Sequence, residues 1–486
     1  MSEKTEAPAV TQKLGLIALV AIVVSSMIGG GVDSLPRSMA LTSAVGPVLL
    51  SWLIAGFGVY FIASTFKILS DIRPDLQTGI YMYAREGFGA FVAFNVAWGY
   101  WLMTIFGNVA FAVMVMDTLN YFFPGEFRGG NNITSIICAS VLVWGFNFVV
   151  LAGVRSAGFI NSIGTLAKII PLVVFVFVLG YSLNYLEFTG NIWGHTPRDP
   201  SDQLGSVFSQ TLAPMDVALW SFIGIEGAVA LSGRAKNNSD VGKATLIGFA
   251  ISLVICILIS ILPFGVAPQS VLKDIPTPST AGALRLVTGE WGAWLMNIGV
   301  LISVLSGWLA WTMLCAEIPM VAAKNGTFPK AFASVNKNGS ASVSLWVSSL
   351  VMQLVILLVY FSNNAWRTML DITAVTVLPA YIASTAYLLK LCMTKEYEKY
   401  AVKGKVFAII SGLIGVCFCL FMLYAGGLKN VVFVPLILTL GMPIFFWTHR
   451  ERKDGAPLFQ GREIIYFYGL LALDLISLVA LWKWYA

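Results

Sequence analysis

The motif MIGGG at residues 27–31 interrupts an apolar run at residues 14–38, and FIGIEG at residues 222–227 interrupts a second run at 207–232. Each glycine within a helix costs about 1 kcal/mol relative to alanine, so a glycine cluster favours an unwound stretch of backbone. The two interruptions fall in the first and the sixth apolar runs of the chain. Interruptions at matching positions of two halves are typical of transporters built from inverted repeats, with the substrate site between the breaks. Close helix packing through small residues is the alternative explanation.

The composition around these motifs is that of a membrane protein. Of the 486 residues, 58% are hydrophobic and only 11% are charged, and the mean hydropathy is +0.82. A soluble domain carries about a quarter charged residues, so most of this chain is unsuited to water. The 32 Phe and 15 Trp residues suit a helix bundle with aromatic residues at the membrane interfaces. The net charge of +6 comes from Lys and Arg scattered over short loops, which does not indicate a nucleic-acid-binding protein.

Apolar runs bounded by charged residues, Pro or Gly recur along the chain, and each is long enough to cross a bilayer, which needs about 20 residues per helix. A lipid-exposed backbone must satisfy its own hydrogen bonds, so the runs predict an all-α polytopic membrane protein with 12–13 transmembrane helices. The thirteen runs lie at residues 14–38, 43–67, 88–117, 133–153, 157–184, 207–232, 242–266, 291–323, 342–361, 367–391, 405–427, 429–448 and 463–482.

The distribution of positive charge predicts the orientation. If the N-terminal tail at residues 1–13 lies in the cytoplasm, about two thirds of the 30 Lys and Arg residues fall on the cytoplasmic side and about a quarter fall outside. This excess supports the alternation of all the runs, including a thirteenth helix that places Ala486 outside. We therefore predict a multi-pass protein of the cell inner (plasma) membrane with a cytoplasmic N-terminus. No signal-peptide cleavage site follows the first run.

The sequence gives little support for metal, haem or covalent chemistry. The two histidines, His195 and His449, lie in polar loops, and the six cysteines lie in or at the ends of apolar runs without metal-ligand spacing. We therefore predict no metal site, no cofactor and no enzyme activity. A membrane-bound sensor is disfavoured because no large soluble domain is visible, and an ion channel because no repeated filter-like loop is visible.

Unwound backbone at the two breaks exposes amides and carbonyls at the middle of the bilayer. Half-helix N-termini attract carboxylates, and freed carbonyls attract ammonium groups. An α-amino acid carries both groups on one carbon, so the architecture predicts an amino-acid-like ligand. The amides of Gly30 and Gly31 would be the donors, and the carbonyls near Met27, Trp220 and Ile223 would be the acceptors.

Charged residues inside the runs indicate function, because they are costly in a bilayer. Asp33 follows the first break, Glu226 lies in the second, and Lys168 lies in the fifth run. A structural ion pair is the alternative for each of them. Two acids near the breaks would offset the desolvation of a cationic ligand, which favours amines and cationic amino acids. Asp216 and Asp371 lie near the ends of their runs and are interpreted as interfacial.

Several strings resemble the amino acid–polyamine–organocation superfamily and, within it, the basic amino acid/polyamine antiporters. Together they extend over most of the chain. Two of the strings, WSFIGIEG and LSGRAK, resemble arginine/ornithine antiporters and their histidine/histamine relatives in particular. The strings are SMIGGGV at 26–32, WSFIGIEG at 220–227, LSGRAK at 231–236, AEIP at 316–319 and NGTFPK at 325–330.

The resemblance implies a leucine-transporter type of fold, which is a five-plus-five inverted repeat with helices 1 and 6 broken. Residues 14–184 would form the first repeat with helices 1–5, and residues 207–391 would form the second with helices 6–10. Residues 405–486 would form the peripheral helices 11–13.

The resemblance also implies roles for residues away from the glycine motifs. Thr104 and Asn108 match positions that line the pocket for the substrate side chain. Trp220 matches an aromatic gate next to the substrate, and Trp311 matches a pocket wall over the aliphatic part of the substrate.

The same resemblance assigns gating and proton coupling to two charged residues. Glu226 matches an acid linked to both processes, and Lys168 resembles a fifth-helix lysine that takes the place of sodium in sodium-independent relatives. Tyr100 on the third run and Gly224 in the second break complete the candidate substrate site.

One position departs from the family pattern, and it bears on the substrate. Relatives usually carry Phe after the glycine-rich break, where this chain has Asp33. An added anion there is expected to alter selectivity, and it strengthens the histidine/histamine alternative.

The function predicted first is antiport of a cationic amino acid against its product amine or amino acid, of the arginine/ornithine type, by alternating access. Histidine/histamine antiport and proton-coupled symport of cationic amino acids are the alternatives. The expected partners are the cationic amino acid and amine substrates, the lipid bilayer and a second copy of the chain in a homodimer, with no nucleic acid.

Overall fold

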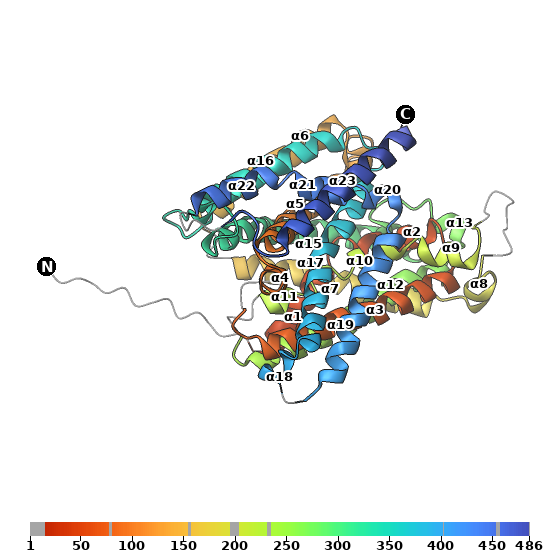
Figure 1. The fold of residues 1–486 in the computed structure, drawn as a ribbon. Helices are drawn as coiled ribbons and strands as arrows, with labels where there is room; N and C mark the ends of the chain where they lie inside the picture. The colour runs from red at the N-terminus through yellow and green to blue at the C-terminus, as the bar shows by residue number, and fades with distance from the viewer. Residues whose placement is uncertain are drawn as a thin grey trace.

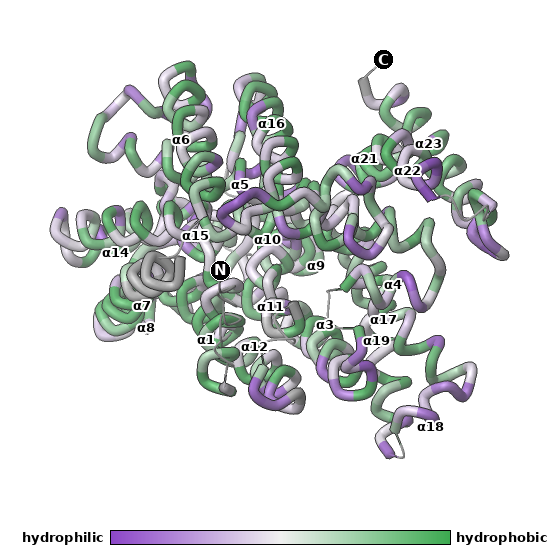
Figure 2. The backbone as a smooth tube through the Cα atoms, turned by 90° about the vertical axis from the view of Figure 1, so that its left-hand side faces the viewer, coloured by the Kyte–Doolittle hydropathy of each residue, from purple (hydrophilic) through white to green (hydrophobic). Residues whose placement is uncertain are grey.

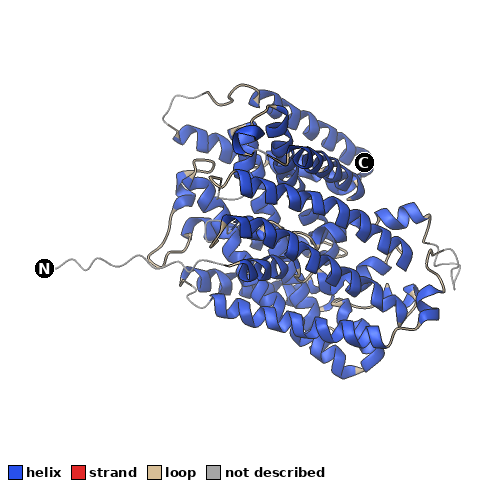
Figure 3. Ribbon diagram, turned by 90° about the horizontal axis from the view of Figure 1, so that it is seen from below, coloured by secondary structure: helices blue, strands red, loops and turns tan. Residues whose placement is uncertain are grey.

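Helices occupy each of the thirteen apolar runs in the computed structural model, which describes residues 15–76, 80–153, 157–194, 204–230, 235–401, 403–452 and 457–485. Over those ranges the only β-type pairing is the isolated bridge between Val335 and Ala341. Figure 3 shows the resulting bundle of helices. The predicted all-α polytopic fold is confirmed. The N-terminal tail at 1–13 and residues 231–234 of the LSGRAK string lie outside the described residues.

The helices and their bounds, labelled as in Figure 1, follow in chain order. They are α1 (Leu16–Met27), η1 (Val32–Ser34), α2 (Leu35–Ala40), α3 (Val45–Ile72), α4 (Ile80–Phe88), α5 (Ala90–Phe122), η2 (Arg128–Gly130), α6 (Ile133–Leu151), α7 (Ala157–Tyr181), α8 (Tyr185–Thr189), α9 (Val207–Leu212), α10 (Met215–Trp220), α11 (Gly227–Ala230), α12 (Asn238–Ile261), η4 (Leu262–Gly265), α13 (Gln269–Leu272), α14 (Ser279–Thr288), α15 (Glu290–Lys324), η5 (Lys330–Ala333), α16 (Ser342–Val359), α17 (Ala365–Met393), α18 (Tyr397–Tyr400), α19 (Lys405–Ala425), α20 (Leu428–Val431), α21 (Phe433–Thr439), α22 (Met442–Glu451) and α23 (Glu463–Tyr485).

Fewer helices cross a membrane by length and composition than the predicted 12–13. Among the described residues there are 10 such helices, or up to 11 if the bent pair Leu16–Met27 and Val32–Ala40 is one span. The two other runs explain the difference. The fifth run forms α7, of which only Ala167–Tyr181 enters this count, because most side chains before residue 167 lie outside the described residues. The sixth run is divided among α9, α10 and α11, so it contains no continuous helix long enough to span.

The helices α5 and α17 form the centre of the bundle. They pack against each other, and α5 also packs on α15 while α17 packs on α19. In the most apolar stretch of α5, 83% of the residues are buried, whereas the figure for α23 is 11%. Figure 2 shows hydrophobic residues along the helices and hydrophilic residues gathered in connections such as the one around α18. The burial therefore places the protein interior around α5 and α17 and the lipid-facing surface at helices such as α23.

Polar side chains fix the starts of several long helices. The Asn132 side chain accepts from the Ser135 amide at 2.9 Å at the start of α6, as expected of an N-cap. The start of α5 is capped by a residue distant in the sequence. The buried Glu463, at the start of α23, accepts a hydrogen bond from the Phe91 amide at 3.1 Å. A carboxylate at a helix N-terminus also interacts favourably with the helix dipole. The last helix thus stabilises the first turn of the central one.

Candidate substrate site

The first glycine cluster unwinds its helix, as its composition predicts. α1 ends at Met27, and the following segment, Val32–Ala40, is bent from it by 45°. Among the described residues, the amides of Gly30 and Gly31 donate no hydrogen bond. Two adjacent amides are therefore available for an anionic group.

The second break supplies acceptors. α10 ends at Trp220, and turns separate it from α11, which begins at Gly227. Within the described part of the chain, the Ile223 carbonyl accepts no hydrogen bond, and the carbonyls of Met27 and Trp220 each accept one. Because a carbonyl oxygen has two lone pairs, Met27 and Trp220 both retain acceptor capacity. All three predicted acceptors are thus able to bind an ammonium group.

The two breaks contact each other. Gly224 has a φ of +103°, and a β-carbon there would lie 2.8 Å from the β-carbon of Ser26. A β-carbon on Gly31 would overlap the indole ring of Trp220. Gly224 also meets Ser26 backbone atoms and has a positive φ, so that position needs glycine, whereas a β-carbon at Gly31 would require the Trp220 ring to move. The contacts bring the candidate donors of the first break next to the candidate acceptors of the second.

Glu226 is buried at the second break, and two tyrosines hold its carboxylate. Tyr100 on α5 donates to Oε1 at 2.6 Å, and Tyr381 on α17 donates to Oε2 at 2.9 Å. The carboxylate therefore connects the broken helix to both central helices. The sequence predicts Tyr100 and Glu226 as site residues but not Tyr381, because nothing distinguishes that tyrosine from others in apolar runs.

Lys168 lies on α7 beside the first broken helix. Its buried ammonium donates to the carbonyl oxygen of Ser25, near the end of α1, at 3.1 Å. The carbonyl end of a helix carries partial negative charge, so a cation is stabilised there. The structure thus brings this predicted residue to the start of the first break.

Asp33 is also buried, and α14 provides its partners. The Thr280 hydroxyl donates to Oδ1 of Asp33 at 3.2 Å, and the Ser279 hydroxyl donates to the Asp33 carbonyl at 3.2 Å. The carboxylate next to the first break is therefore fixed to a helix outside the two central ones. Thr280 carries no signal in the sequence that marks it as a partner of Asp33.

Aromatic rings enclose the region between the breaks. A β-carbon on Gly107 of α5 would lie 2.6 Å from Cζ3 of Trp311 and 3.6 Å from Cη2 of Trp220, so bare backbone faces both rings. Phe111 meets Trp311 edge to face, with ring centroids 5.3 Å apart. Phe111 also lies against Gly29 of the first break, and no pattern in the sequence marks it as a residue of this wall.

Thr104 and Asn108 are buried on the same helix, α5. Asn108 donates to the Thr104 carbonyl at 2.7 Å, and Thr104 donates to the Trp101 carbonyl at 2.6 Å. On the other side, Thr312 of α15 donates to Oδ1 of Asn108 at 3.4 Å. Asn108 therefore connects the α5 wall to α15, the helix that carries Trp311, and Thr104 lies one turn away on the same helix.

Two broken helices that meet at free backbone donors and acceptors, beside a buried carboxylate and a buried ammonium, define the class of secondary transporters for small charged solutes. Comparison with known proteins agrees with this class. A family model described as amino acid permease matches residues 14–445.

Close relatives narrow the assignment. The chain is 53% identical over 470 residues to the arginine/agmatine antiporter of Chlamydia pneumoniae, covering 96% of this chain and 97% of that protein. It is 51% identical over 471 residues to the arginine/agmatine antiporter of Chlamydia abortus, with 96% and 97% covered. The chain belongs to the amino acid permease family and, within it, to the basic amino acid/polyamine antiporters, as its motifs indicate.

Proposed function

We propose that this chain exchanges arginine for its decarboxylated amine, agmatine, across the cell membrane by alternating access. The observation that carries the proposal is the meeting of the two breaks, where the Gly30 and Gly31 amides and the Ile223 carbonyl make no hydrogen bond within the described residues. These backbone groups match the carboxylate and the amine of an amino acid. The sequence alone favours ornithine as the counter-substrate, and the names of the relatives favour agmatine.

Arginine and agmatine cannot use all of the same groups in the site. Agmatine lacks the carboxylate that the Gly30 and Gly31 amides would bind, so the affinity for both must come from the amine and guanidinium groups. The carbonyls of Met27, Trp220 and Ile223 would hold the amine. A guanidinium stacks well on aromatic faces, which suits the Trp311 ring.

The remaining predicted residues have roles in selectivity and gating. Thr104 and Asn108 would line the pocket for the guanidinium end, and Gly224 allows the two breaks to approach. Glu226 would hold the second break to α5 and α17 through its tyrosines, and its protonation would weaken that connection. Lys168 would stabilise the end of α1 in place of a sodium ion.

Asp33 is proposed to tune selectivity between an amine and an amino acid. Its carboxylate lies beside the first break, where a substrate carboxylate would also bind. Like charges repel, so Asp33 would weaken arginine more than agmatine at this position.

We also propose the arrangement of repeats, the membrane orientation and the assembly that the sequence predicts. Residues 14–184 and 207–391 would be the inverted repeats, supported by breaks in the first and sixth runs, and residues 405–486 would be peripheral. The excess of positive charge supports a cytoplasmic N-terminus. The protein would move its substrates without covalent chemistry, and a homodimer is its proposed assembly.

The proposal is tested with purified protein in liposomes. Vesicles are loaded with agmatine, arginine, ornithine, histamine or buffer, and labelled arginine is added outside. We expect rapid uptake only into vesicles that contain arginine or agmatine. Equal uptake into empty vesicles would contradict exchange, and uptake there driven by a pH gradient would establish proton-coupled symport instead. Labelled histidine entering histamine-loaded vesicles faster than arginine enters agmatine-loaded ones would overturn the substrate assignment.

A further inference from the structure

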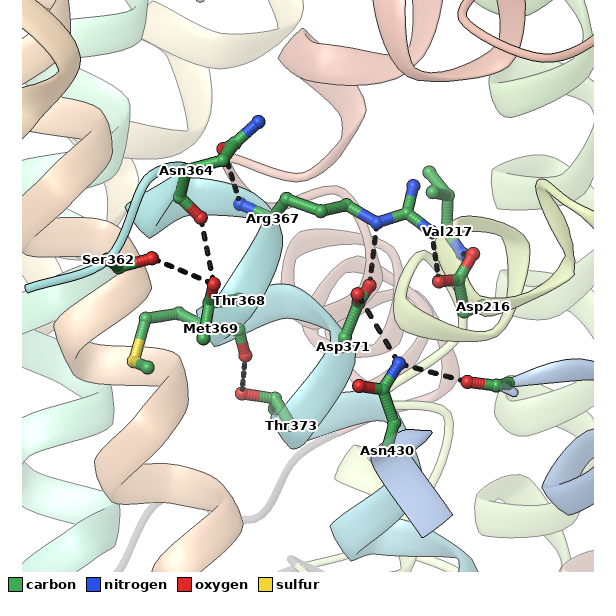
Figure 4. A network of polar contacts seen from close by, with 11 residues as sticks. Asp216, Val217, Ser362, Asn364, Arg367, Thr368, Met369, Asp371, Thr373 and Asn430 are labelled. Atoms are coloured by element: carbon green, nitrogen blue, oxygen red, sulfur yellow. Dashed lines mark hydrogen bonds and ion pairs between the residues drawn. The ribbon is translucent and has the colours of Figure 1, made fainter. Parts of the chain in front are cut away.

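A network of charged side chains joins the start of α10 to the start of α17 (Figure 4). Its residue Asp216 lies at the start of α10, whereas Glu226 follows the end of that helix at Trp220. Arg367, near the start of α17, forms an ion pair with Asp216 of α10. Its Nε also lies 2.8 Å from Oδ1 of Asp371, one turn further along α17. Asn430 of α20 donates to the other oxygen of Asp371 at 3.4 Å. The guanidinium therefore bridges a half-helix that borders the candidate site and a central helix of the bundle.

This network is largely shielded from water. The side chains of Asp216 and Asp371 are 5% and 14% exposed, and that of Arg367 is 29% exposed. Charge pairs interact more strongly in such surroundings than on an open surface. The interpretation of the two acids as merely interfacial is therefore incomplete.

The network is connected directly to the aromatic gate. Trp220 follows Asp216 by about one helical turn on α10. Trp366 adjoins Arg367 on α17, and the rings of Trp220 and Trp366 meet edge to face with centroids 6.4 Å apart. Trp220 in turn covers Gly31 of the first break. An ion pair and an aromatic pair thus connect α10 to α17 in two successive layers above the candidate site.

We propose that Arg367 is a positioning residue that holds α10, and with it Trp220, in the closed position by pairing with Asp216. In the orientation proposed above, the starts of α10 and α17 face the outside, so Arg367 controls outward opening. The inference rests on the proposed transport function for its purpose, but not on the identity of the substrates.

Asp371 explains how the ion pair between Arg367 and Asp216 can break and re-form. Removing one partner of a buried ion pair leaves an uncompensated charge, which is strongly unfavourable. When α10 moves away, Arg367 keeps its contact with Asp371 on its own helix. Asp216 keeps the hydrogen bond from the Val217 amide, which is 2.8 Å long in this structure. Each acid contacts a different nitrogen of the guanidinium, so the contact with Asp371 can persist when Asp216 leaves. Asp216 favours the closed position, and Asp371 favours the open one.

This arrangement predicts opposite effects for two conservative variants. Asp216→Asn removes the charge on α10 but keeps the oxygen that accepts from Val217, so outward opening should increase. Asp371→Asn leaves Asp216 as the remaining charged partner of Arg367, so outward opening should decrease. A network that only stabilises the fold would respond to both changes in the same direction.

Outward opening is measured without substrate, on intact cells, with an impermeant thiol reagent. Thr104→Cys, placed in a background without the six native cysteines, reports access to the buried face of α5. We expect Asp216→Asn to raise the labelling rate about fivefold and Asp371→Asn to lower it by a similar factor. Arg367→Ala should raise it, and Arg367→Lys should restore most of the closed state because it keeps the charge.

The control is Asp71→Asn, which removes the i,i+4 pair of Lys67 and Asp71 on α3 and should leave labelling unchanged. Equal thermal stability of all variants excludes general unfolding as the cause. Labelling that moves in the same direction in Asp216→Asn and Asp371→Asn, or that changes in neither, overturns the inference. Labelling is measured in the absence of substrate, so a failure of arginine/agmatine exchange in liposomes leaves this result interpretable.

Discussion

The two breaks differ in what they contribute and in what holds them. The first, at residues 28–31, is rich in glycine, and neither of its neighbouring charges is held by the central helices: Lys168 of α7 donates to the Ser25 carbonyl of α1, and Asp33 accepts from Thr280 of α14. The second, at residues 221–226, carries its own carboxylate, Glu226, which is held by the central helices α5 and α17.

The difference indicates that the two halves of the site have separate tasks. The first break provides a fixed pair of amides whose geometry depends on the absence of side chains. The second provides the Glu226 carboxylate and the Trp220 ring, which contact the central helices. Changes at the first break should therefore act through shape, and changes at the second through electrostatics.

The largest effect is expected where the breaks touch. Gly224→Ala places a β-carbon 2.8 Å from Ser26 at a φ of +103°, a conformation that alanine adopts only with strain. We expect arginine exchange in liposomes to fall about 30-fold or more, equivalent to about 2 kcal/mol. Gly31→Ala should cost less, because the atoms it meets belong to the Trp220 side chain, which can turn away.

The matched control for both variants is Gly145→Ala in α6, where a β-carbon has no neighbour within 4 Å. It should keep full exchange. If Gly224→Ala retains wild-type exchange, the close contact between the breaks is not required for transport.

Glu226→Gln tests the electrostatic task of the second break. The amide keeps the size of the carboxylate but lacks its charge and can accept fully from only one of the two tyrosines. We expect the exchange rate to fall about tenfold while arginine binding by calorimetry changes little. Tyr381→Phe should give a smaller loss. A large loss of binding with an unchanged maximal rate would assign Glu226 to substrate binding rather than gating.

Trp311→Ala tests the wall that faces the second break. Loss of the ring removes a cation–π contact and should weaken arginine and agmatine binding about tenfold, which corresponds to about 1.4 kcal/mol. The thermal unfolding midpoint should stay close to that of the wild type. Calorimetry on both ligands measures the change, and a selective loss of arginine alone would contradict the proposed contact with the shared guanidinium.

Asp33→Asn tests whether the first break acts on selectivity. Asparagine keeps the oxygen that accepts from Thr280, so the fold should be preserved. We expect the ratio of arginine to agmatine affinity to rise about threefold, because repulsion of the substrate carboxylate is removed. Unchanged binding of both ligands by calorimetry would show that Asp33 does not act on the substrate.

The smallest effect is expected at the ion pair of Arg73 and Asp75, which lies outside both breaks and shows how much an exposed charge pair contributes to stability. The hydrogen bond from Arg73 lowers the pKa of Asp75 below its usual 3.8. A lowered pKa in the folded state contributes stability above pH 3.8 that is lost as the pH falls through the lowered value. The Asp75 side chain is 58% exposed, so Asp75→Asn should cost less than about 1 kcal/mol at pH 7. The difference in thermal midpoint from the wild type should shrink on acidification; a growing difference would contradict the lowered pKa.

The parts of the site that depend on local chemistry could be predicted from the sequence. Glycine clusters marked both breaks because the conformational preference of glycine acts within its own segment of chain. Glu226 and Lys168 were identifiable because a charge in an apolar run is costly wherever the run packs. Their positions beside the breaks agree with that reasoning.

The partners of these charges could not be predicted. Tyr381 is 155 residues from Glu226, and Thr280 is 247 residues from Asp33. Such pairs are set by how the helices pack, and an uncharged hydroxyl in an apolar run has no distinctive pattern. The same holds for Arg367, whose place between two acids depends on the approach of α10 to α17.

The cap on α5 has a consequence for the biogenesis of the protein. Phe91 is made early, while Glu463, which accepts from its amide, lies on the last helix. The ribosome must therefore synthesise the chain as far as α23 before the central helix can acquire this cap. Until α23 inserts, the first turn of α5 depends on other acceptors, so the most buried helix receives its final contact from a lipid-facing one.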